Sequence, residues 1–347
     1  MKNKKFGNVY VMYHKEDNDG VFSAAIASHA LKDKCKSLVL VPVTYTEINK
    51  LVDTCVAMKN LLDDNGNTNL LIMLDISMTP KNMEKVYQVL KDNFIWCDHH
   101  KPIILASHQK PYTFGNCPGY HDRTDQSALI ATYKYFNNMV DDGNISELPY
   151  LLQVLGVYDS WTHKLRGFDF DLINHVNYAI TYDTQLSVDN VLQDYDFFTS
   201  PDWDEEYCKS FAKYGESIEK TKIADVRNIL ENSADFAWLV GDDNRPAVAF
   251  FSNIKYNSAI YKTALSQVLG DPSSTVGNVN GKNIIVFSND INFPDKVTMS
   301  LYNVDDTDKF DCGAYLKEKY NGGGHVGAGG CVLTLSKAKT IMKNHAI

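Results

Sequence analysis

Four segments of this 347-residue chain contain aspartate, histidine or both at positions that suit metal-ion chemistry. They are His14-Lys15-Glu16-Asp17-Asn18-Asp19-Gly20, Asp75, Asp98-His99-His100 and Asp159. Taken alone, each has an ordinary explanation as a turn or a helix cap. If they meet, their carboxylates repel one another unless cations lie between them. Mixed carboxylate and imidazole donors favour Mn²⁺ over Ca²⁺ or a structural Zn²⁺.

The Asp-Asn-Asp-Gly sequence also occurs in the calcium loops of EF-hands. With Asp19 at the fifth position of such a loop, Lys15 and Ile26 fall at the first and twelfth positions. Both positions need oxygen ligands, which excludes an EF-hand.

The first two hundred residues alternate short β-rich runs with helical stretches, which predicts crossover units and a parallel sheet. The expected strands are Asn8–Tyr13, Ser37–Val43, Asn69–Leu74 and Asn93–Cys97. One expected helix begins directly after Gly20. The others cover Ile48–Leu62, Lys81–Leu90, Ser127–Phe136 and Leu148–Val157. Ligands of open parallel sheets sit beyond the carboxyl ends of the strands, where most of the aspartate and histidine segments begin. We therefore expect these donors to converge on one sheet edge.

The sequence changes near residue 235 from a polar, helical stretch to a series of strand-like segments. We predict a first domain over residues 1–200, a helical linker over 201–235 with its helix at Glu206–Leu230, and a smaller α/β domain over 236–347. Residues 236–347 carry 11 basic and 10 acidic side chains, whereas the remainder carries 23 basic and 33 acidic ones. Chemistry that needs carboxylates is thus expected in the first domain.

The order of these motifs resembles that of the DHH phosphoesterase superfamily, which is named after the motif found here as Asp98-His99-His100. The second domain resembles the associated DHHA1 domain through its glycine-rich run around His325. The resemblance implies a parallel-sheet DHH domain with flanking helices, a smaller α/β DHHA1 domain and an active site in the interdomain cleft. The Asp159-Ser160-Trp161 segment is most similar to oligoribonuclease or nanoRNase members.

By position, the resemblance implies ligands for two divalent cations. His14, Asp17 and Asp75 would hold one ion, and the second would be held by Asp19, Asp75, His99 and Asp159. Mn²⁺ is the expected metal, with Mg²⁺ or Co²⁺ as alternatives. The spacing of the first motif departs from that of many relatives, so Glu16 remains an alternative to Asp17.

The same resemblance assigns His100 to the substrate phosphate or leaving group and Asp98 to the orientation of a histidine. These two residues are the predicted catalytic pair, and a hydroxide activated by the two metals is the predicted nucleophile.

In the second domain, Gly322–Gly327 formally matches a dinucleotide-binding motif but lacks its strand–helix context. We predict instead an open loop in which Gly323, Gly324 and His325 bind an anionic ligand.

The roles of several other side chains are predicted from their positions near these motifs. Tyr302 stands where DHHA1 domains often carry an arginine, and either core packing or base stacking fits it. Ser300, Asn303 and Arg123 are the predicted replacements for that arginine in substrate binding. We expect Trp161 to pack against the protein rather than to stack on a base.

Composition restricts the class of substrate. A net charge of −9 disfavours long duplex nucleic acid held by a broad basic surface. Seven scattered cysteines, no signal-peptide pattern and no apolar run of membrane-spanning length predict a cytoplasmic protein without a membrane partner.

The predicted function is Mn²⁺-dependent hydrolysis of short oligonucleotides to 5′-mononucleotides. The alternatives are phosphatase or phosphodiesterase activity on 3′,5′-bisphosphonucleosides or on linear or cyclic dinucleotides, and a non-catalytic nucleotide sensor. The partner is expected to be a short oligonucleotide or a small nucleotide, and the oligomeric state stays open.

Overall fold

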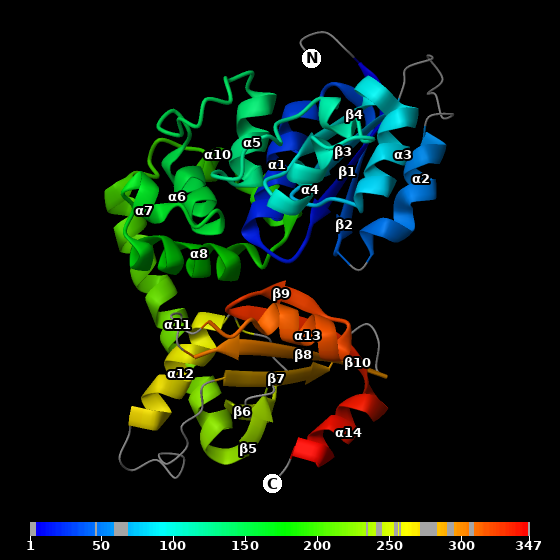
Figure 1. Ribbon diagram of the computed structural model, residues 1–347. Helices are drawn as coiled ribbons and strands as arrows, with labels where there is room; N and C mark the ends of the chain where they lie inside the picture. The colour runs from blue at the N-terminus through cyan, green and yellow to red at the C-terminus, as the bar shows by residue number, and fades with distance from the viewer. Residues whose placement is uncertain are drawn as a thin grey trace. The chain divides into compact units, whose positions relative to one another are not determined.

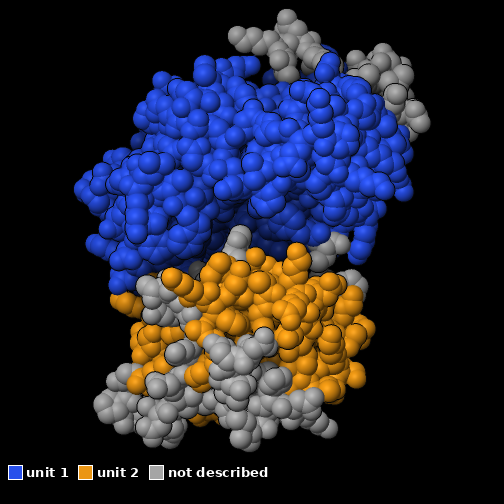
Figure 2. Space-filling view, viewed as in Figure 1, with its two compact units in different colours: residues 1–217 blue, residues 218–347 orange. Residues whose placement is uncertain are grey.

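The computed structural model describes residues 5–45, 47–58, 69–233, 235–240, 245–252, 256, 258–270, 283–289, 295–304 and 309–345. The chain divides into two compact units, residues 1–217 and 218–347 (Figure 2). The division falls inside the long helix α11 (Glu205–Ser233), which covers the predicted linker helix.

The first unit is built on a four-stranded parallel sheet of order β2-β1-β3-β4 (Figure 1). Its strands are β1 (Phe6–His14), β2 (Cys35–Val43), β3 (Leu70–Leu74) and β4 (Phe94–Cys97). Every residue of β3 and β4 is buried, as continuous apolar strands covered on both faces require. The predicted parallel α/β domain is confirmed.

Helices cover this sheet and extend beyond it. They are α1 (Asn18–Leu31), α2 (Val52–Ala57), α3 (Pro80–Leu90), α4 (Lys101–Ser107), α5 (Ala128–Phe136), α6 (Tyr150–Asp159), α7 (His163–Arg166), α8 (Phe170–Thr184), α9 (Val188–Gln193) and α10 (Tyr195–Phe198), with 3₁₀ turns at Ile48–Leu51, Lys91–Asn93 and Phe114–Asn116. Among the helices of the described residues, none is both long and apolar enough to span a bilayer.

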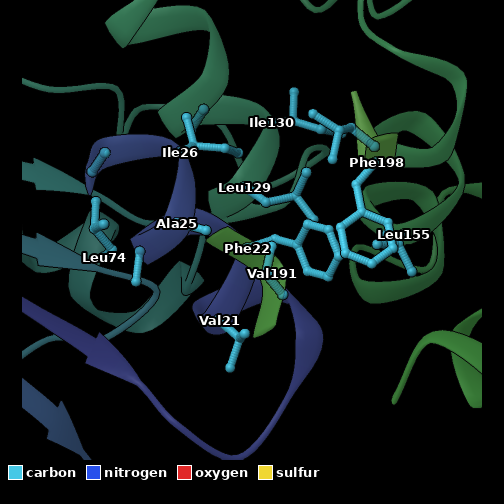
Figure 3. Close-up of a cluster of buried hydrophobic side chains, with 14 of the residues drawn as sticks. Val21, Phe22, Ala25, Ile26, Leu74, Leu129, Ile130, Leu155, Val191 and Phe198 are labelled. Carbon is cyan, nitrogen blue, oxygen red and sulfur yellow. The ribbon is translucent and has the colours of Figure 1, made fainter. Parts of the chain in front are cut away.

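Side chains of β1 alternate between two cores, one on each face of the sheet. Val9 and Val11 join a core formed with α1, α5, α6 and α8, whereas Met12 joins the core beneath α3 and α4. Figure 3 shows the first core, in which Phe22 of α1 meets Phe198 of α10 edge-on at 5.6 Å. These cores fix the ends of β1, β3 and β4, and therefore the residues that follow them.

The second unit contains a six-stranded sheet of order β5-β6-β7-β8-β10-β9. Only β6 and β7 pair in parallel; the other neighbours are antiparallel. The elements are β5 (Asp235–Val240), β6 (Arg245–Phe251), α12 (Ser258–Gly270), β7 (Asn283–Asn289), β8 (Lys296–Asn303), α13 (Cys312–Tyr320), β9 (Gly323–His325), β10 (Ala328–Thr334) and α14 (Leu335–His345).

Two regions differ from the sequence prediction. The helix predicted over Ile48–Leu62 is a 3₁₀ turn followed by α2, and residues 59–62 lie outside the described residues. The predicted glycine-rich loop is instead the antiparallel hairpin of β9 and β10, because its glycines let two backbones pair closely. A Cβ on Gly324, whose φ is +143°, would lie 2.4 Å from Cα of Gly329.

Candidate metal and phosphate site

The segment between β1 and α1 supplies three of the predicted ligands. His14 ends β1, Asp17 caps α1 by accepting a hydrogen bond from the Gly20 amide (3.0 Å), and Asp19 lies in the first helical turn. Gly20 is required here, because a Cβ would lie 2.0 Å from the carbonyl oxygen of His14. The close approach holds His14 beside Asp17, with 3.5 Å between His14 Nε2 and Asp17 Oδ2.

Asp19 is buried and fixed by a second helix. Its two carboxylate oxygens accept hydrogen bonds from the backbone amides of Ala128 (2.8 Å) and Leu129 (2.7 Å) at the start of α5. A helix N-terminus interacts favourably with a carboxylate, so the two amides hold this side chain at a defined position.

Asp75 follows β3 with its backbone in the left-handed region (φ 55°), which costs about 1–3 kcal/mol for a residue other than glycine. Its amide donates to the carbonyl of Cys97 at the end of β4 (3.0 Å). The side chain is 2% exposed, and within the described residues its Oδ1 has no hydrogen-bond partner. A buried oxygen without a hydrogen-bond partner indicates a position where an ion or a ligand binds.

His99 joins the carboxylates into one cluster. Its Nε2 lies 3.1 Å from Asp159 Oδ2, 3.5 Å from Asp75 Oδ1 and 3.7 Å from Asp19 Oδ2. Asp159, the last residue of α6, likewise has an Oδ2 without a hydrogen-bond partner in the described part of the chain. The residues predicted as ligands are thus brought together, although the sequence separates them by up to 145 positions.

The electrostatics of the cluster are unfavourable without a cation. Burial, followed by the negative charges of Asp19, Asp17 and Asp159, raises the pKa of Asp75 well above its usual value. Burial and the charges of Asp19 and Asp17 raise the pKa of Asp159 in the same way. The pKa of Asp17 is also raised, first by burial and then by Asp19, although His14 opposes the shift.

Asp98 has the opposite environment. Its carboxylate accepts hydrogen bonds from the Ser77 hydroxyl, the Trp96 indole (3.2 Å) and the His99 and His100 amides (2.7 and 3.2 Å). Burial would raise the pKa of Asp98, but its hydrogen bond from His100 and the nearby histidine charge hold that pKa well below its usual value. Asp98 is therefore a permanent acceptor.

His100 is oriented by Asp98. Its Nδ1 lies 2.6 Å from Asp98 Oδ1 and must carry the proton, because an ionised carboxylate only accepts. Burial lowers the pKa of His100, but the bond to Asp98 and the nearby carboxylates outweigh it and raise that pKa. This orients Nε2 as the second reactive nitrogen of the ring.

Tyr45 is a site residue that the sequence analysis missed. Its hydroxyl lies 2.9 Å from His100 Nε2, and its ring centroid lies 5.1 Å from that of His14. Burial and the charges of Asp98 and Asp75 raise the pKa of Tyr45, so the hydroxyl stays protonated. Tyr45 comes two residues after β2, so extending the same strand-end rule to that strand would have found it.

Glu16, Arg123 and Trp161 have different surroundings. The Glu16 carboxylate lies 3.9 Å from His14 Nε2, farther than Asp17, and Glu16 stays an alternative ligand. Arg123 forms an ion pair with Asp125 (2.5 Å) in a pocket that also contains Arg166. Trp161 is 66% exposed, and its ring stacks on that of Phe170, so it packs against the protein at the surface.

In the second unit, Asn303 and Tyr302 belong to the core. The Asn303 amide is fully buried, donates to the carbonyls of Phe310 (2.9 Å) and Val326 (3.3 Å), and accepts from Asn283 (2.8 Å). It supports the turn of the hairpin, which corrects its predicted contact with substrate. Tyr302 is 9% exposed and stacked on Tyr261, so its core alternative holds.

The other predicted substrate contacts of this unit lie along β8 and β9. Ser300 is buried in β8 opposite Gly330, and Gly323 pairs with Gly330 from the other side of β10. Space is open where a Cβ on Gly323 would lie. The His325 side chain lies outside the described residues.

The first unit offers donors that fit divalent cations. Two sets have ligand atoms within 4.8 Å of one another, namely Asp75, His99 and His100, and Asp19, His99 and Asp159. Asp75 Oδ1, Asp159 Oδ2 and His14 Nδ1 are buried without a hydrogen-bond partner in the described region, which agrees with such a role. The oxygen and imidazole donor set suits Mn²⁺ and related ions.

Comparisons with known proteins give the following similarities. No curated protein matches the chain. Similar solved structures include the pGpG-specific phosphodiesterase PggH from Vibrio cholerae, with 13% identity, a TM-score of 0.45, and 98% of this chain and 97% of that chain covered. Exonuclease RecJ bound to manganese shares 12% identity with a TM-score of 0.47, covering 97% of this chain and 88% of that chain. RecJ from Thermus thermophilus in complex with Mg²⁺ shares 11% identity with a TM-score of 0.43, covering 97% of this chain and 48% of that chain.

The family model describes the DHH family, N-terminal domain, and it matches residues 8–151. That range contains β2 to β4, all of β1 but its first two residues, and every site residue discussed for the first unit except Asp159, Trp161 and Arg166. Its motif is present as Asp98-His99-His100, with Asp98 held as the permanent acceptor and His99 at the centre of the carboxylates. Over residues 8–151 the chain is therefore similar to the DHH family, N-terminal domain.

Proposed function

We propose that the protein hydrolyses phosphodiester bonds of short oligonucleotides with two Mn²⁺ ions and releases 5′-mononucleotides. The observation that carries the proposal is a pair of buried carboxylate oxygens without a hydrogen-bond partner among the described residues. They are Asp75 Oδ1 and Asp159 Oδ2, which lie 3.5 and 3.1 Å from His99 Nε2. Buried like charges with unpaired oxygens are costly unless a cation binds them.

In this proposal His14, Asp17 and Asp75 hold one ion, and Asp19, His99, Asp159 and Asp75 hold the other. When bound, a pair of divalent ions lowers the pKa of water and stabilises negative charge on phosphate oxygens. The amides of Ala128 and Leu129 keep the Asp19 carboxylate oriented, so this ligand needs no rearrangement.

His100 is proposed to contact the phosphate through Nε2. Since Asp98 keeps the proton on Nδ1, Nε2 either donates to a phosphate oxygen when the ring is charged or accepts when it is neutral. The raised pKa of His100 favours the charged ring, which can protonate a leaving alkoxide. Asp98 acts through His100 and is a positioning residue.

For the second unit we propose that the hairpin around Gly323, Gly324 and His325, with Ser300 of β8, contacts the substrate. The support is the open space beside Gly323, which lets a ligand approach the backbone. Asn303 is left out because its amide is used within the unit.

The proposal is tested by turnover with Mn²⁺ over dinucleotides, cyclic dinucleotides, 3′,5′-bisphosphonucleosides and polyphosphate. We expect 5′-mononucleotides from linear dinucleotides, no turnover with EDTA, and loss of bound Mn²⁺ in Asp75→Ala. Preferential release of phosphate from 3′,5′-bisphosphonucleosides would replace the proposed substrate. Nucleotide binding without turnover of any compound would identify a sensor and overturn the enzyme.

A further inference from the structure

Trp161 occupies a backbone position that favours glycine. At the end of α6, the Trp161 amide donates to the carbonyl of Tyr158 and the Thr162 amide donates to that of Val157 (both 3.3 Å). These two bonds form a Schellman motif, in which the residue in the place of Trp161 adopts a left-handed conformation and is usually glycine. Its φ is 55°, and it is the only aromatic residue with positive φ in the described ranges.

Burial does not offset this unfavourable conformation. Trp161 is 66% exposed, more than any other tryptophan whose side chain is described; Trp96 and Trp203 are at most 1% exposed. Tryptophan is highly buried on average, and this one is not.

The ring of Trp161 belongs to a small aromatic surface. It stacks on Phe170 with 5.5 Å between ring centroids and 23° between planes, and it lies nearly parallel to Tyr158 at 6.3 Å. We call Tyr158, Trp161 and Phe170 the aromatic platform. Phe170 begins α8 and Tyr158 lies in the last turn of α6, so both neighbours are held by helices.

The platform is joined directly to the candidate metal site. Asp159, whose Oδ2 lies 3.1 Å from His99, is two residues before Trp161 in the same helix end. The two Schellman hydrogen bonds span Asp159 and therefore fix Trp161 relative to it.

We infer that the aromatic platform binds a nucleobase of the substrate by stacking on Trp161. This inference rests on the proposed function and names how the substrate is recognised: a phosphate held by the metal site next to a base held by the platform. Stacking accepts any base, because every base has a π face, so the platform provides a preference for nucleotides over other phosphate esters without sequence specificity.

The test separates base binding from folding, because glycine at position 161 suits the backbone. We compare the wild-type protein with Trp161→Gly and Trp161→Phe by calorimetric titration of adenosine 5′-monophosphate and of ribose 5-phosphate in Mn²⁺. Gln185→Gly is the matched control, since Gln185 is exposed, ends α8 and has a φ of 52°.

We expect the wild type to bind the nucleotide more tightly than the sugar phosphate. Trp161→Gly should weaken nucleotide binding by about 5- to 150-fold and leave ribose 5-phosphate unchanged. Trp161→Phe should keep most of the preference. Both glycine variants should melt at a higher temperature than the wild type, which shows that lost binding is not lost folding.

Three results would overturn the inference: equal wild-type affinity for the two ligands, an unchanged preference in Trp161→Gly, or an equal loss for both ligands in that variant. Failure of the proposed function is seen separately, as absence of dinucleotide turnover by the wild type. Dinucleotide turnover that is the same in wild type and Trp161→Gly, with the same KM, would reject the platform alone.

Discussion

The aspartate–histidine cluster of the first unit and the glycine hairpin of the second are both conspicuous in the sequence, yet their polar groups are treated in opposite ways. In the cluster, Asp75 and Asp159 each keep a buried oxygen without a hydrogen-bond partner in the described structure, beside like charges. In the hairpin, Gly323 and Gly324 pair with Gly330 and Gly329, and Asn303 holds the turn.

The contrast separates two uses of an unusual sequence. The hairpin uses its glycines for close backbone pairing, which a structural role explains. The cluster accepts a left-handed Asp75 and several buried like charges, and neither stabilises the fold. Unfavourable local energetics therefore identify the functional region more sharply than sequence pattern does.

The largest expected effect is that of Asp75→Asn. Asparagine fits the volume and tolerates the left-handed backbone, but it removes the charge that a metal ion needs. We expect phosphodiesterase activity to fall by about 10³-fold or more, and the metal-free protein to become more stable, measured by turnover and by urea denaturation.

Asp53→Asn is the control for this prediction, because Asp53 forms only an exposed ion pair with Lys85 (2.6 Å). It should change neither quantity measurably. A metal-free Asp75→Asn protein that is less stable than the wild type would show that the cluster supports the fold, and the contrast with the hairpin would fail.

The pH dependence of stability should reverse when metal is removed. Because the pKa values of Asp75 and Asp159 are raised in the folded state, folding binds protons. In EDTA, the contribution of these two groups to the free energy of unfolding should be largest below the ordinary carboxyl pKa of about 4. It should fall as the pH rises through their raised pKa values.

With Mn²⁺ present, stability should instead rise over the same range, since the ions bind the deprotonated carboxylates. Thermal denaturation from pH 5 to 8, with EDTA or with Mn²⁺, measures both slopes. Asp75→Asn should flatten the slope in EDTA. The same slope with and without metal would contradict the assignment of these carboxylates as ligands.

Much of this contrast could be predicted from the sequence, and the rest depends on side-chain partners. The strands preceding Asp75 and Asp98 are continuous apolar runs, so the parallel sheet and the convergence of the site at its edge follow from general rules of such sheets. The exposure of Trp161 and the burial of Asn303 do not follow, because neither residue type nor spacing specifies what a side chain packs against. Helix α8 could not be predicted from the sequence either, since its segment mixes polar and aromatic residues without a clear helical periodicity.

A pair of glycine variants tests the hairpin. A Cβ on Gly324 would overlap Gly329, and the φ of +143° disfavours any side chain, so Gly324→Ala should destabilise the second unit by about 1–3 kcal/mol. Gly323→Ala should leave stability unchanged, because no atom of the described residues lies within 4 Å of the added Cβ. Urea denaturation of the two variants measures the difference.

Gly323→Ala also reports on substrate contact. If the hairpin binds substrate as proposed, this variant raises KM for a dinucleotide without a change in stability. Unchanged KM would leave the glycine run with a purely structural role, which would sharpen the contrast with the metal cluster.

The smallest expected effect is that of Tyr45→Phe. The lost hydroxyl lies 2.9 Å from His100 Nε2, so the variant removes one hydrogen bond to a ring already oriented by Asp98. Loss of about 1 kcal/mol corresponds to about a fivefold decrease in kcat, with bound Mn²⁺ unchanged because Tyr45 is not a proposed ligand. Tyr182→Phe, at an exposed tyrosine of α8, should have no effect. A decrease in bound Mn²⁺ in Tyr45→Phe would instead place Tyr45 in the support of His14, the other ring that it contacts.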